Sequence, residues 1–387
     1  MEPCRLASLL LIARTPGVHA RQLRAAWGPA RPEDSDAAAS HQRPAHPPRD
    51  PSGAADPVEA LLAAPLPPRT RALLEQPNRR ALEADLRWVA AHDCRVLACT
   101  EAAYPPALLD LPDAPAVLFV QGNPALLVQP QVAVVGARAA SLTGRAIARE
   151  FAAALARAGL AVTSGLAVGI DAAAHEGALD AGGSSIAVYA TGLDRTYPRS
   201  HQDLAARIRG AGALVSERPP GTPPRPGLFP LRNRLIAALC RATLVVEAAP
   251  GSGSLGTART AARLSRPVFA VPGSIRSRLA QGCHQLIRAG AGLAGCAAEL
   301  LQDLGISFEN QRSSQPGMAP PQPPPPDGSL DKAAEMLLDA AGFEPVGIDF
   351  LVERTGLSGP VIASLLLVLE LRGRVAPHPG GRYCRLT

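Results

Sequence analysis

Residues 132–141 read VAVVGARAAS, a short apolar run that ends in a glycine turn and leads into an alanine-rich segment. The same order of strand, glycine turn and helix recurs at SGLAVGIDAAAH (164–175) and at EAAPGSGSLGT (247–257). In open parallel α/β sheets such turns point backbone N–H groups at anionic ligands. Before the last turn, FPLRNRLIAAL (229–239) adds two arginines near the start of a helical run. Several such turns together with paired arginines favour a long polyanion over one small nucleotide.

The overall composition sets the limits of this interpretation. With 387 residues, 47% of them apolar, the chain is long enough for two or three domains with a sizeable core. The net charge of +6 permits a polyanionic partner, and nearly all of the basic charge is arginine, whose planar fork suits phosphate. Seven scattered cysteines without a CxxC pair argue against a disulfide framework or a zinc site and fit a reducing cytoplasm. Apolar runs stay shorter than the roughly 18 residues of a membrane span, so no membrane partner is expected.

Changes in composition divide the chain into four parts. Residues 1–92 are predicted to form a helical domain that is SAM-like or helix–hairpin–helix-like, with a disordered insertion at 29–57. Residues 93–308 alternate short apolar strands with helical runs, which is typical of an α/β fold with a mostly parallel, doubly wound sheet. A proline-rich linker is predicted at 309–328. Three helices and a β-hairpin follow at 329–387, the pattern of a winged helix.

The first two glycine turns contain the first candidate residues. Gly136 ends a strand and Arg138 lies in the same turn, so both are predicted to face an anion. Gly165 begins the second turn. Asp171 and His175 follow it with the i, i+4 spacing of one helix face. Without a nucleophile beside them, this pair favours a structural role over a catalytic one.

The basic stretch begins with an aromatic residue, Phe229, which can stack on a base. The polar residues that follow can clamp phosphates or bond to bases and sugars; they are Arg232, Asn233 and Arg234. Basic charge at a helix N-terminus opposes the helix dipole, and a pattern that breaks a local rule favours binding over a merely solvated face. Tyr197 and Arg199 supply a further aromatic and basic pair on a loop.

The third glycine turn combines glycine with hydroxyl groups at a helix start and predicts another anion cradle. Its candidate residues are Ser252, Gly253, Ser254 and Gly256. Because the turn contains neither GKT nor GKS, it is not a Walker A loop, which disfavours ATP hydrolysis. Cys283 beside His284 resembles a nucleophile with its base, but adjacent residues of a helix point apart, so this interpretation is disfavoured too.

The ordered motifs between Tyr104 and Ala291 resemble those of the DNA-processing protein A family, DprA, also called Smf. The motifs are YPPALLDLPDAPAVLFVQG, VAVVGAR, SGLAVGIDAAAH, GLDRTYP, LVSERPPGTPP, FPLRNRLIAAL, VVEAAPGSGSLGTA, VFAVPG and GCHQLIRAGA. Their number, order and spacing make the resemblance specific. The helical N-terminal part and the winged helix resemble the flanking domains of the same family more loosely.

The resemblance implies an extended Rossmann-like fold that binds single-stranded DNA. It further implies a protein that protects incoming strands during natural transformation, helps to load the RecA recombinase and forms a homodimer. Catalytic activity, a metal or a cofactor is not implied. By position in the family's motifs, the DNA pocket is implied to be formed by Gly136, Arg138, Gly165, Arg199, Phe229, Arg232, Asn233, Arg234, Ser252, Gly253, Ser254 and Gly256.

Two other functions compete with this one. A nucleotide or nucleoside-phosphate hydrolase on a similar fold would use GSGSLGT as its phosphate loop and Glu247 as its acid, but would leave the arginine-rich stretch without a purpose. A transcription factor would read DNA with the helix at 358–371, which is strongly apolar and so resembles a partner surface more than a reader of the major groove.

Overall fold

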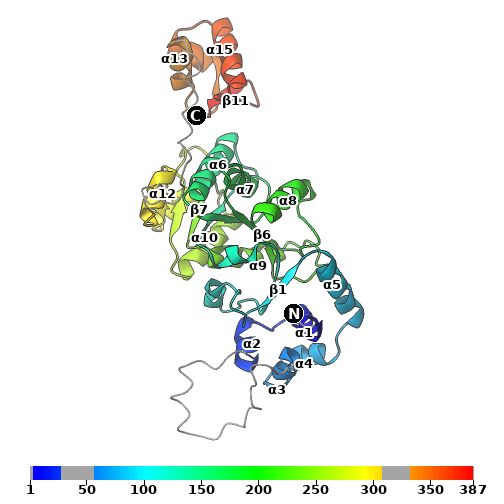
Figure 1. Cartoon of the computed structure of the whole chain (residues 1–387). Helices are drawn as coiled ribbons and strands as arrows, with labels where there is room; N and C mark the ends of the chain where they lie inside the picture. The colour runs from blue at the N-terminus through cyan, green and yellow to red at the C-terminus, as the bar shows by residue number, and fades with distance from the viewer. Residues whose placement is uncertain (1–2, 28–55, 307–331, 387) are drawn as a thin grey trace, which may run out of the picture.

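The computed structural model describes residues 3–27, 56–306 and 332–386. Figure 1 shows a helical N-terminal part, a central sheet flanked by helices, and a small C-terminal unit. The predicted insertion at 29–57 lies almost entirely outside the described residues, and the predicted linker at 309–328 lies wholly outside them.

The central sheet contains nine strands in the order β1-β2-β6-β5-β4-β3-β7-β8-β9. They are β1 (Arg95–Ala98), β2 (Val117–Gly122), β3 (Gln131–Val135), β4 (Ala161–Ser164), β5 (Ser185–Val188), β6 (Ala213–Ser216), β7 (Ala242–Val245), β8 (Val268–Ala270) and β9 (Gly292–Leu293). β2 pairs antiparallel with both β1 and β6, and all other neighbours are parallel. This confirms the predicted mostly parallel α/β sheet. β9 was not predicted, because two residues are too short to show a strand pattern.

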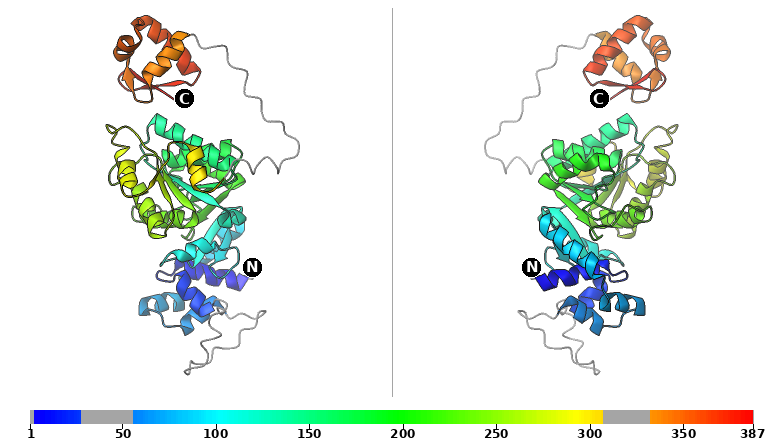
Figure 2. Two further views of the ribbon diagram at one scale, coloured as in Figure 1. Left: turned by 90° about the vertical axis from the view of Figure 1, so that its left-hand side faces the viewer. Right: turned by 90° about the vertical axis from the view of Figure 1, so that its right-hand side faces the viewer.

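Helices pack on both faces of the sheet (Figure 2). Those of the central part are α6 (Leu142–Arg157), α7 (Ile170–Asp180), α8 (Gln202–Ala211), α9 (Leu228–Leu239), α10 (Gly253–Arg263), α11 (Gln281–Arg288) and α12 (Ala297–Asp303). Along β3, Val132 and Val134 belong to the core that contains α6, α7 and α12. Ala133 and Val135 belong to the core that contains α9 and α10. A strand covered on both faces carries apolar side chains on both, which explains the continuous apolar runs of the sequence.

The strand order places a topological switch point at the carboxyl edge of the sheet. The chain runs from β3 through β4 and β5 to β6, and then returns to place β7 on the other side of β3. The loops after β3 and β7 therefore lead in opposite directions, and ligands of doubly wound folds bind where this happens. The three glycine turns of the sequence follow β3, β4 and β7, so all of them lie at this edge.

The N-terminal helices pack beside the antiparallel end of the sheet. They are α1 (Pro3–Arg14), α2 (Ala20–Trp27), α3 (Pro57–Ala63), α4 (Pro68–Glu75) and α5 (Arg79–Ala91). Leu9 and Leu23 are fully buried in the same core as Leu97 of β1 and Leu118 of β2. The helical part and the sheet therefore share one hydrophobic core.

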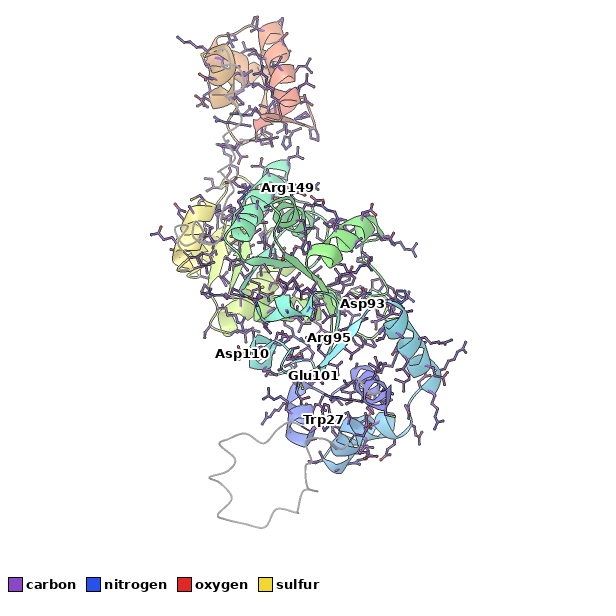
Figure 3. All side chains as sticks on the ribbon, in the orientation of Figure 1. Trp27, Asp93, Arg95, Glu101, Asp110 and Arg149 are labelled. Carbon is purple, nitrogen blue, oxygen red and sulfur yellow. The ribbon has the colours of Figure 1, made fainter. Side chains whose placement is uncertain are left out.

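Two arginines of α1 stabilise this packing. The guanidinium carbon of Arg5 lies 4.9 Å from the ring centroid of Trp27, and its Nη2 lies 3.6 Å from Oε1 of Glu101. Trp27 and Glu101 are labelled in Figure 3. Nη2 of Arg14 donates to Oδ1 of Asp85 on α5 at 2.6 Å. Burial raises the pKa of the Asp85 carboxyl, and Arg14, whose side chain is partly exposed, opposes the shift.

The C-terminal unit is a winged helix, as the sequence predicted. Its elements are α13 (Lys332–Ala341), β10 (Val346–Gly347), α14 (Ile348–Thr355), α15 (Gly359–Leu371), β11 (Val375–His378) and β12 (Arg382–Arg385). The strands are ordered β10-β12-β11, and the two-residue β10 was not predicted. Leu337, Leu351, Ile362 and Leu366 are buried in the core of this unit.

Within the described ranges, no single helix is long and apolar enough to cross a membrane. α14 and α15 meet the criterion of length and composition only when they are taken together, and the chain bends by 108° between them. Both helices contribute buried leucine and isoleucine side chains to the winged-helix core, which accounts for their apolar character.

Candidate nucleic-acid interface

Hydrogen bonds join the loops after β3 and β7 at the carboxyl edge of the sheet. Ser141 caps α6 by accepting a hydrogen bond from the N–H of Gly144 at 2.9 Å. The carboxylate of Glu247, in the loop after β7, accepts from the Ser141 N–H at 2.9 Å and from its hydroxyl at 2.5 Å. Both loops are therefore held in place before any ligand arrives.

An arginine and two aromatic rings meet at this edge from three different elements. The guanidinium carbon of Arg138, in the loop after β3, lies 5.3 Å from the ring centroid of Phe229 on α9. The ring of Tyr197, in the loop after β5, lies 5.5 Å from that of Phe229 at an interplanar angle of 47°. Arg138 is exposed, as is Arg199 two residues after Tyr197. We call Arg138, Tyr197, Arg199 and Phe229 the edge cluster.

Tyr197 is the member of the edge cluster that the predicted pocket left out. Its side chain is 47% exposed and so remains accessible to a ligand. The aromatic–basic pair with Arg199 was the signal for it in the sequence. Its contact with Phe229 depends on how the loop after β5 folds onto α9, which the spacing of the two residues does not reveal.

Arg232 lies inside the protein, contrary to its predicted place in a DNA pocket. It is 5% exposed, and its Nη1 donates to the carbonyl of Gly165 at 2.6 Å and to that of Val188. Its Nε donates to Oδ1 of Asn233 at 3.1 Å. The reason is helix periodicity, because Arg232 precedes buried Leu235 by three residues and therefore shares its face. Arg232 thus holds the loop after β4 and the end of β5 against α9.

Asp171 binds the backbone of Gly165 as well, close to the charge of Arg232. We call Arg232, Gly165 and Asp171 the buried clamp. Oδ2 of Asp171 accepts from the N–H of Gly165 at 3.1 Å and of Ala167 at 3.3 Å. Burial raises the pKa of the Asp171 carboxyl, whereas the charge of Arg232 and these N–H groups lower it. Burial likewise lowers the pKa of the Arg232 guanidinium to about 10, and Asp171 opposes that shift.

His175 does not form a pair with Asp171. Its Nδ1 lies 2.7 Å from the hydroxyl of Ser185 on β5, and burial lowers the pKa of the ring to about 3. A neutral, fully buried imidazole bonded to a strand residue is a structural group. The sequence interpretation that favoured a structural role for Asp171 and His175 agrees with this geometry.

Arg234 is also occupied by other protein groups. Its Nε lies 2.8 Å from Oδ2 of Asp113, and its Nη2 lies 2.6 Å from Oε2 of Glu217. The side chain is 13% exposed. Arg218 shares the same acid, with its Nη2 at 2.9 Å from Oε1 of Glu217. Arg234 was predicted to clamp phosphate, but in the structure it forms ion pairs with Asp113 and Glu217.

Two of the predicted glycines serve packing. A Cβ atom at Gly165 would lie 2.4 Å from Nη2 of Arg232, so only glycine leaves room for the buried guanidinium. A Cβ atom at Gly136 would lie 2.6 Å from Cγ1 of Ile170. In both turns the glycine backbone therefore lies against a side chain of another element. This packing alone accounts for the two glycines, without a ligand.

The turn after β7 is different, because its glycines face open space. Nothing lies within 4 Å of a Cβ atom built on Gly256, and one on Gly253 would meet only the amide nitrogen of Asn233 at 4.0 Å. Ser252 lies at the N-cap of α10, where no side chain caps the helix, and its hydroxyl lies 2.8 Å from that of buried Ser254. Asn233 donates to the carbonyl of Gly253 at 3.4 Å, which joins this turn to α9.

The residues of the two enzymatic alternatives have other partners in the structure. Glu247, the acid of the hydrolase alternative, is bonded to Ser141. Burial raises the pKa of the Cys283 thiol to about 12, so this side chain is not a nucleophile at neutral pH. Nε2 of His284 lies 3.0 Å from the carbonyl of Gly273. Among the described residues there is also no cluster of three or more potential metal ligands.

The winged helix presents an apolar surface where a DNA reader would present polar side chains. α15 is the helix in the recognition position, and its exposed large side chains are Val361, Leu367, Val368 and Leu371. Reading of base edges requires hydrogen-bonding groups such as those of arginine, asparagine or glutamine. This surface agrees with the interpretation that disfavoured a transcription factor.

Two family models match the sequence. That of DNA recombination-mediator protein A matches residues 95–305, and that of the DprA winged helix domain matches residues 319–381. The chain belongs to the DNA recombination-mediator protein A family, DprA. Protein Smf of Escherichia coli (strain K12) is 42% identical over 311 residues, which cover 80% of this chain and 82% of that protein. DNA processing protein DprA of Streptococcus pneumoniae (strain ATCC BAA-255 / R6) is 46% identical over 200 residues, which cover 52% of this chain and 71% of that protein.

Solved structures of DprA proteins share the fold. The X-ray structure of DprA from Streptococcus pneumoniae matches with a TM-score of 0.61 and 33% identity, over 77% of this chain and 96% of that one. A structure of DNA processing protein A from Helicobacter pylori, described as giving insights into a unique single-stranded DNA binding mode, matches with a TM-score of 0.50 and 29% identity. It covers 55% of this chain and 95% of that one. The resemblance seen in the sequence is thereby confirmed.

Proposed function

We propose that this DprA protein binds single-stranded DNA at the carboxyl edge of its sheet, and that the edge cluster makes the main contacts. The observation that carries the proposal is the meeting of exposed Arg138 with the rings of Phe229 and Tyr197. Arginines for phosphate beside aromatic faces for bases are the two components of single-strand sites that do not depend on sequence.

The described ion pairs support this choice of residues. Arg232 and Arg234 are bonded to protein groups, whereas Arg138 and Arg199 have no ion-pair partner in the described ranges. Of the four arginines predicted for the pocket, Arg138 and Arg199 are therefore the two whose charges remain for phosphate. The open turn from Ser252 to Gly256 and the amide of Asn233 lie beside it as further backbone and side-chain donors.

We predict that the protein binds single-stranded oligonucleotides more tightly than a duplex of the same length. In a duplex the base faces are stacked on one another and cannot reach the rings of Phe229 and Tyr197, whereas each base stacked on an aromatic residue contributes about 1–3 kcal/mol. Fluorescence anisotropy with labelled oligothymidylate and its duplex with oligoadenylate checks this. Equal affinity for the two forms would show that only backbone charge is recognised and would refute the role of the rings.

The wider role that we propose is that of a mediator without catalytic activity. The protein would act in the cytoplasm as a homodimer. It would protect incoming single strands during natural transformation and help to load a RecA-type recombinase. Membership of the DprA family supports this role. The test measures the lag before a recombinase begins to hydrolyse ATP on single strands that are coated with single-strand-binding protein. We expect this protein to shorten the lag, and an unchanged lag contradicts the proposal.

A further inference from the structure

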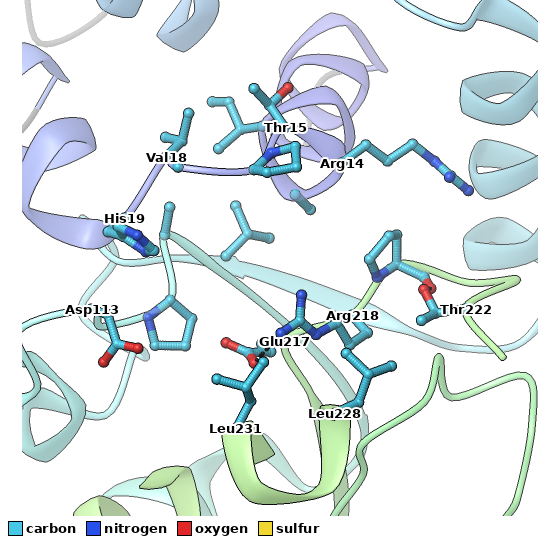
Figure 4. A pocket seen from close by; sticks show the side chains of 18 of the residues that line it. Arg14, Thr15, Val18, His19, Asp113, Glu217, Arg218, Thr222, Leu228 and Leu231 are labelled. Carbon is cyan, nitrogen blue, oxygen red and sulfur yellow. Dashed lines mark hydrogen bonds and ion pairs between the residues drawn. The ribbon is translucent and has the colours of Figure 1, made fainter. Parts of the chain in front are cut away.

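A cavity lies on the other side of the first turn of α9 from Phe229. Its volume is about 700 Å³, and it is enclosed by the turn between α1 and α2, the loop before β2, and the segment from β6 to α9. Figure 4 shows His19, Arg218, Leu228 and Leu231 around it. The helical N-terminal part and the sheet thus form this cavity together, and the function described so far does not use it.

The cavity has an excess of positive charge. Arg218 and Arg234 line it together with Asp113 and Glu217, and these four groups neutralise one another through ion pairs. Arg225 lines it as well and is exposed, and it has no ion-pair partner in the part of the chain that the structure describes. The cavity therefore has one arginine to offer to an anion.

His19 adds a second polar group to the cavity. It comes from the turn between α1 and α2, and its backbone N–H is held by Gln22 at 3.0 Å. Its ring is half-buried and forms no hydrogen bond with the described residues. An imidazole in this position can bond to a phosphate or to a base.

Part of the cavity wall is apolar, and the rest includes Arg14, Thr15 and Thr222. Leu228 and Leu231 face the cavity from α9, and Leu231 is 45% exposed. Prolines complete this wall; they are Pro16, Pro115, Pro219, Pro220 and Pro223. A ligand that fits both properties has flat apolar faces and negative charge, which is the chemistry of a nucleotide.

The position of the cavity relative to the edge cluster indicates which nucleotide would bind there, namely one that belongs to the bound strand. Phe229 belongs to the edge cluster, whereas the neighbouring Leu228 lines the cavity, so only the first turn of α9 separates the two. Arg225 stands just before this turn. A strand held at the edge cluster can therefore cross the N-terminus of α9, pass Arg225 and enter the cavity.

We propose that the cavity is a second subsite for the same single strand, in which Arg225 and His19 bind phosphate or base and the leucine–proline wall covers the base. The inference rests on the proposed function, since the strand reaches the cavity from the edge cluster. It assigns DNA contacts to the helical N-terminal part, which the predicted site did not include.

The test compares the affinity of oligothymidylates of increasing length for the wild-type full-length protein, Arg225→Ala and His19→Ala. Oligonucleotides that occupy only the edge cluster bind all three proteins equally. Longer ones bind wild type about tenfold more tightly than either variant, because only they reach the second subsite. Arg263→Ala is the matched control, since exposed Arg263 ends α10 at the opposite edge of the sheet, and it behaves as wild type at every length.

The two proposals fail in different ways. If both variants gain as much affinity with length as wild type does, the cavity is not a subsite, and binding at the edge cluster stands. If short oligonucleotides fail to bind wild type, or bind Arg138→Ala as tightly as wild type, the edge cluster itself is refuted and the second subsite with it. Photo-cross-linking with thiothymidine supplies a second readout: long oligonucleotides label the segments 12–19 or 217–228, and labelling of neither overturns the subsite.

Discussion

Arg232→Ala lowers the free energy of unfolding by about 2–4 kcal/mol, because two buried carbonyl groups lose their hydrogen-bond donor at a cost of about 1–3 kcal/mol each. The variant leaves the carboxylate of Asp171 buried without its cationic neighbour. It also leaves the carbonyls of Gly165 and Val188 without the donor they share. Urea unfolding at neutral pH, followed by circular dichroism, measures the loss.

Two controls sharpen this test of the buried clamp. Arg263→Ala, which removes an exposed arginine, changes the unfolding free energy by less than about 0.5 kcal/mol. Arg232→Lys keeps the charge but loses the planar fork, so its loss of stability lies between those of Arg232→Ala and wild type. If Arg232→Ala unfolds at the same urea concentration as wild type but loses DNA affinity, Arg232 is a DNA contact after all.

Combining Arg138→Ala with Phe229→Ala weakens single-strand binding about 100-fold or more. Loss of one stacked base accounts for about 1–3 kcal/mol, and loss of a phosphate contact adds to it. Arg138 is exposed and Phe229 is half-buried, so the fold survives this double substitution better than it survives Arg232→Ala. Fluorescence anisotropy at fixed salt measures the affinity.

Two single substitutions of Phe229 test the contribution of its aromatic ring. Phe229→Tyr keeps an aromatic face and retains most of the affinity, whereas Phe229→Leu keeps an apolar side chain of similar size and does not. An unchanged affinity of the double variant would place the strand elsewhere on the protein.

The strands and turns were predictable because the signals for them are local. An apolar run followed by glycine indicates the end of a buried strand, and this pattern correctly placed the turns after β3, β4 and β7 at one edge of a mostly parallel sheet. The winged helix was found in the same way from three helical runs and a hairpin. The two-residue strands β9 and β10 could not be predicted. Pairing with a neighbouring strand defines them, and two residues are too few to show an alternating pattern.

The roles of the arginines were harder to predict because they depend on partners distant in sequence. The three-residue spacing of Arg232 from Leu235 does predict that both lie on the buried face of α9. Its partners lie in the loop after β4 and at the end of β5, and those of Arg234 are Asp113 and Glu217. An arginine next to another in sequence therefore indicates nothing about which of them remains free for DNA.

The central claim is that Arg138 and Arg199 bind phosphate. The salt dependence of single-strand affinity tests it most directly, because the slope of log K against log salt is about −0.7 for each phosphate neutralised. For Arg138→Ala and for Arg199→Ala, the slope becomes shallower than that of wild type by about 0.7 each, and for Arg263→Ala it does not change. Equal slopes for all four proteins would show that the strand binds away from the edge cluster and would contradict the account.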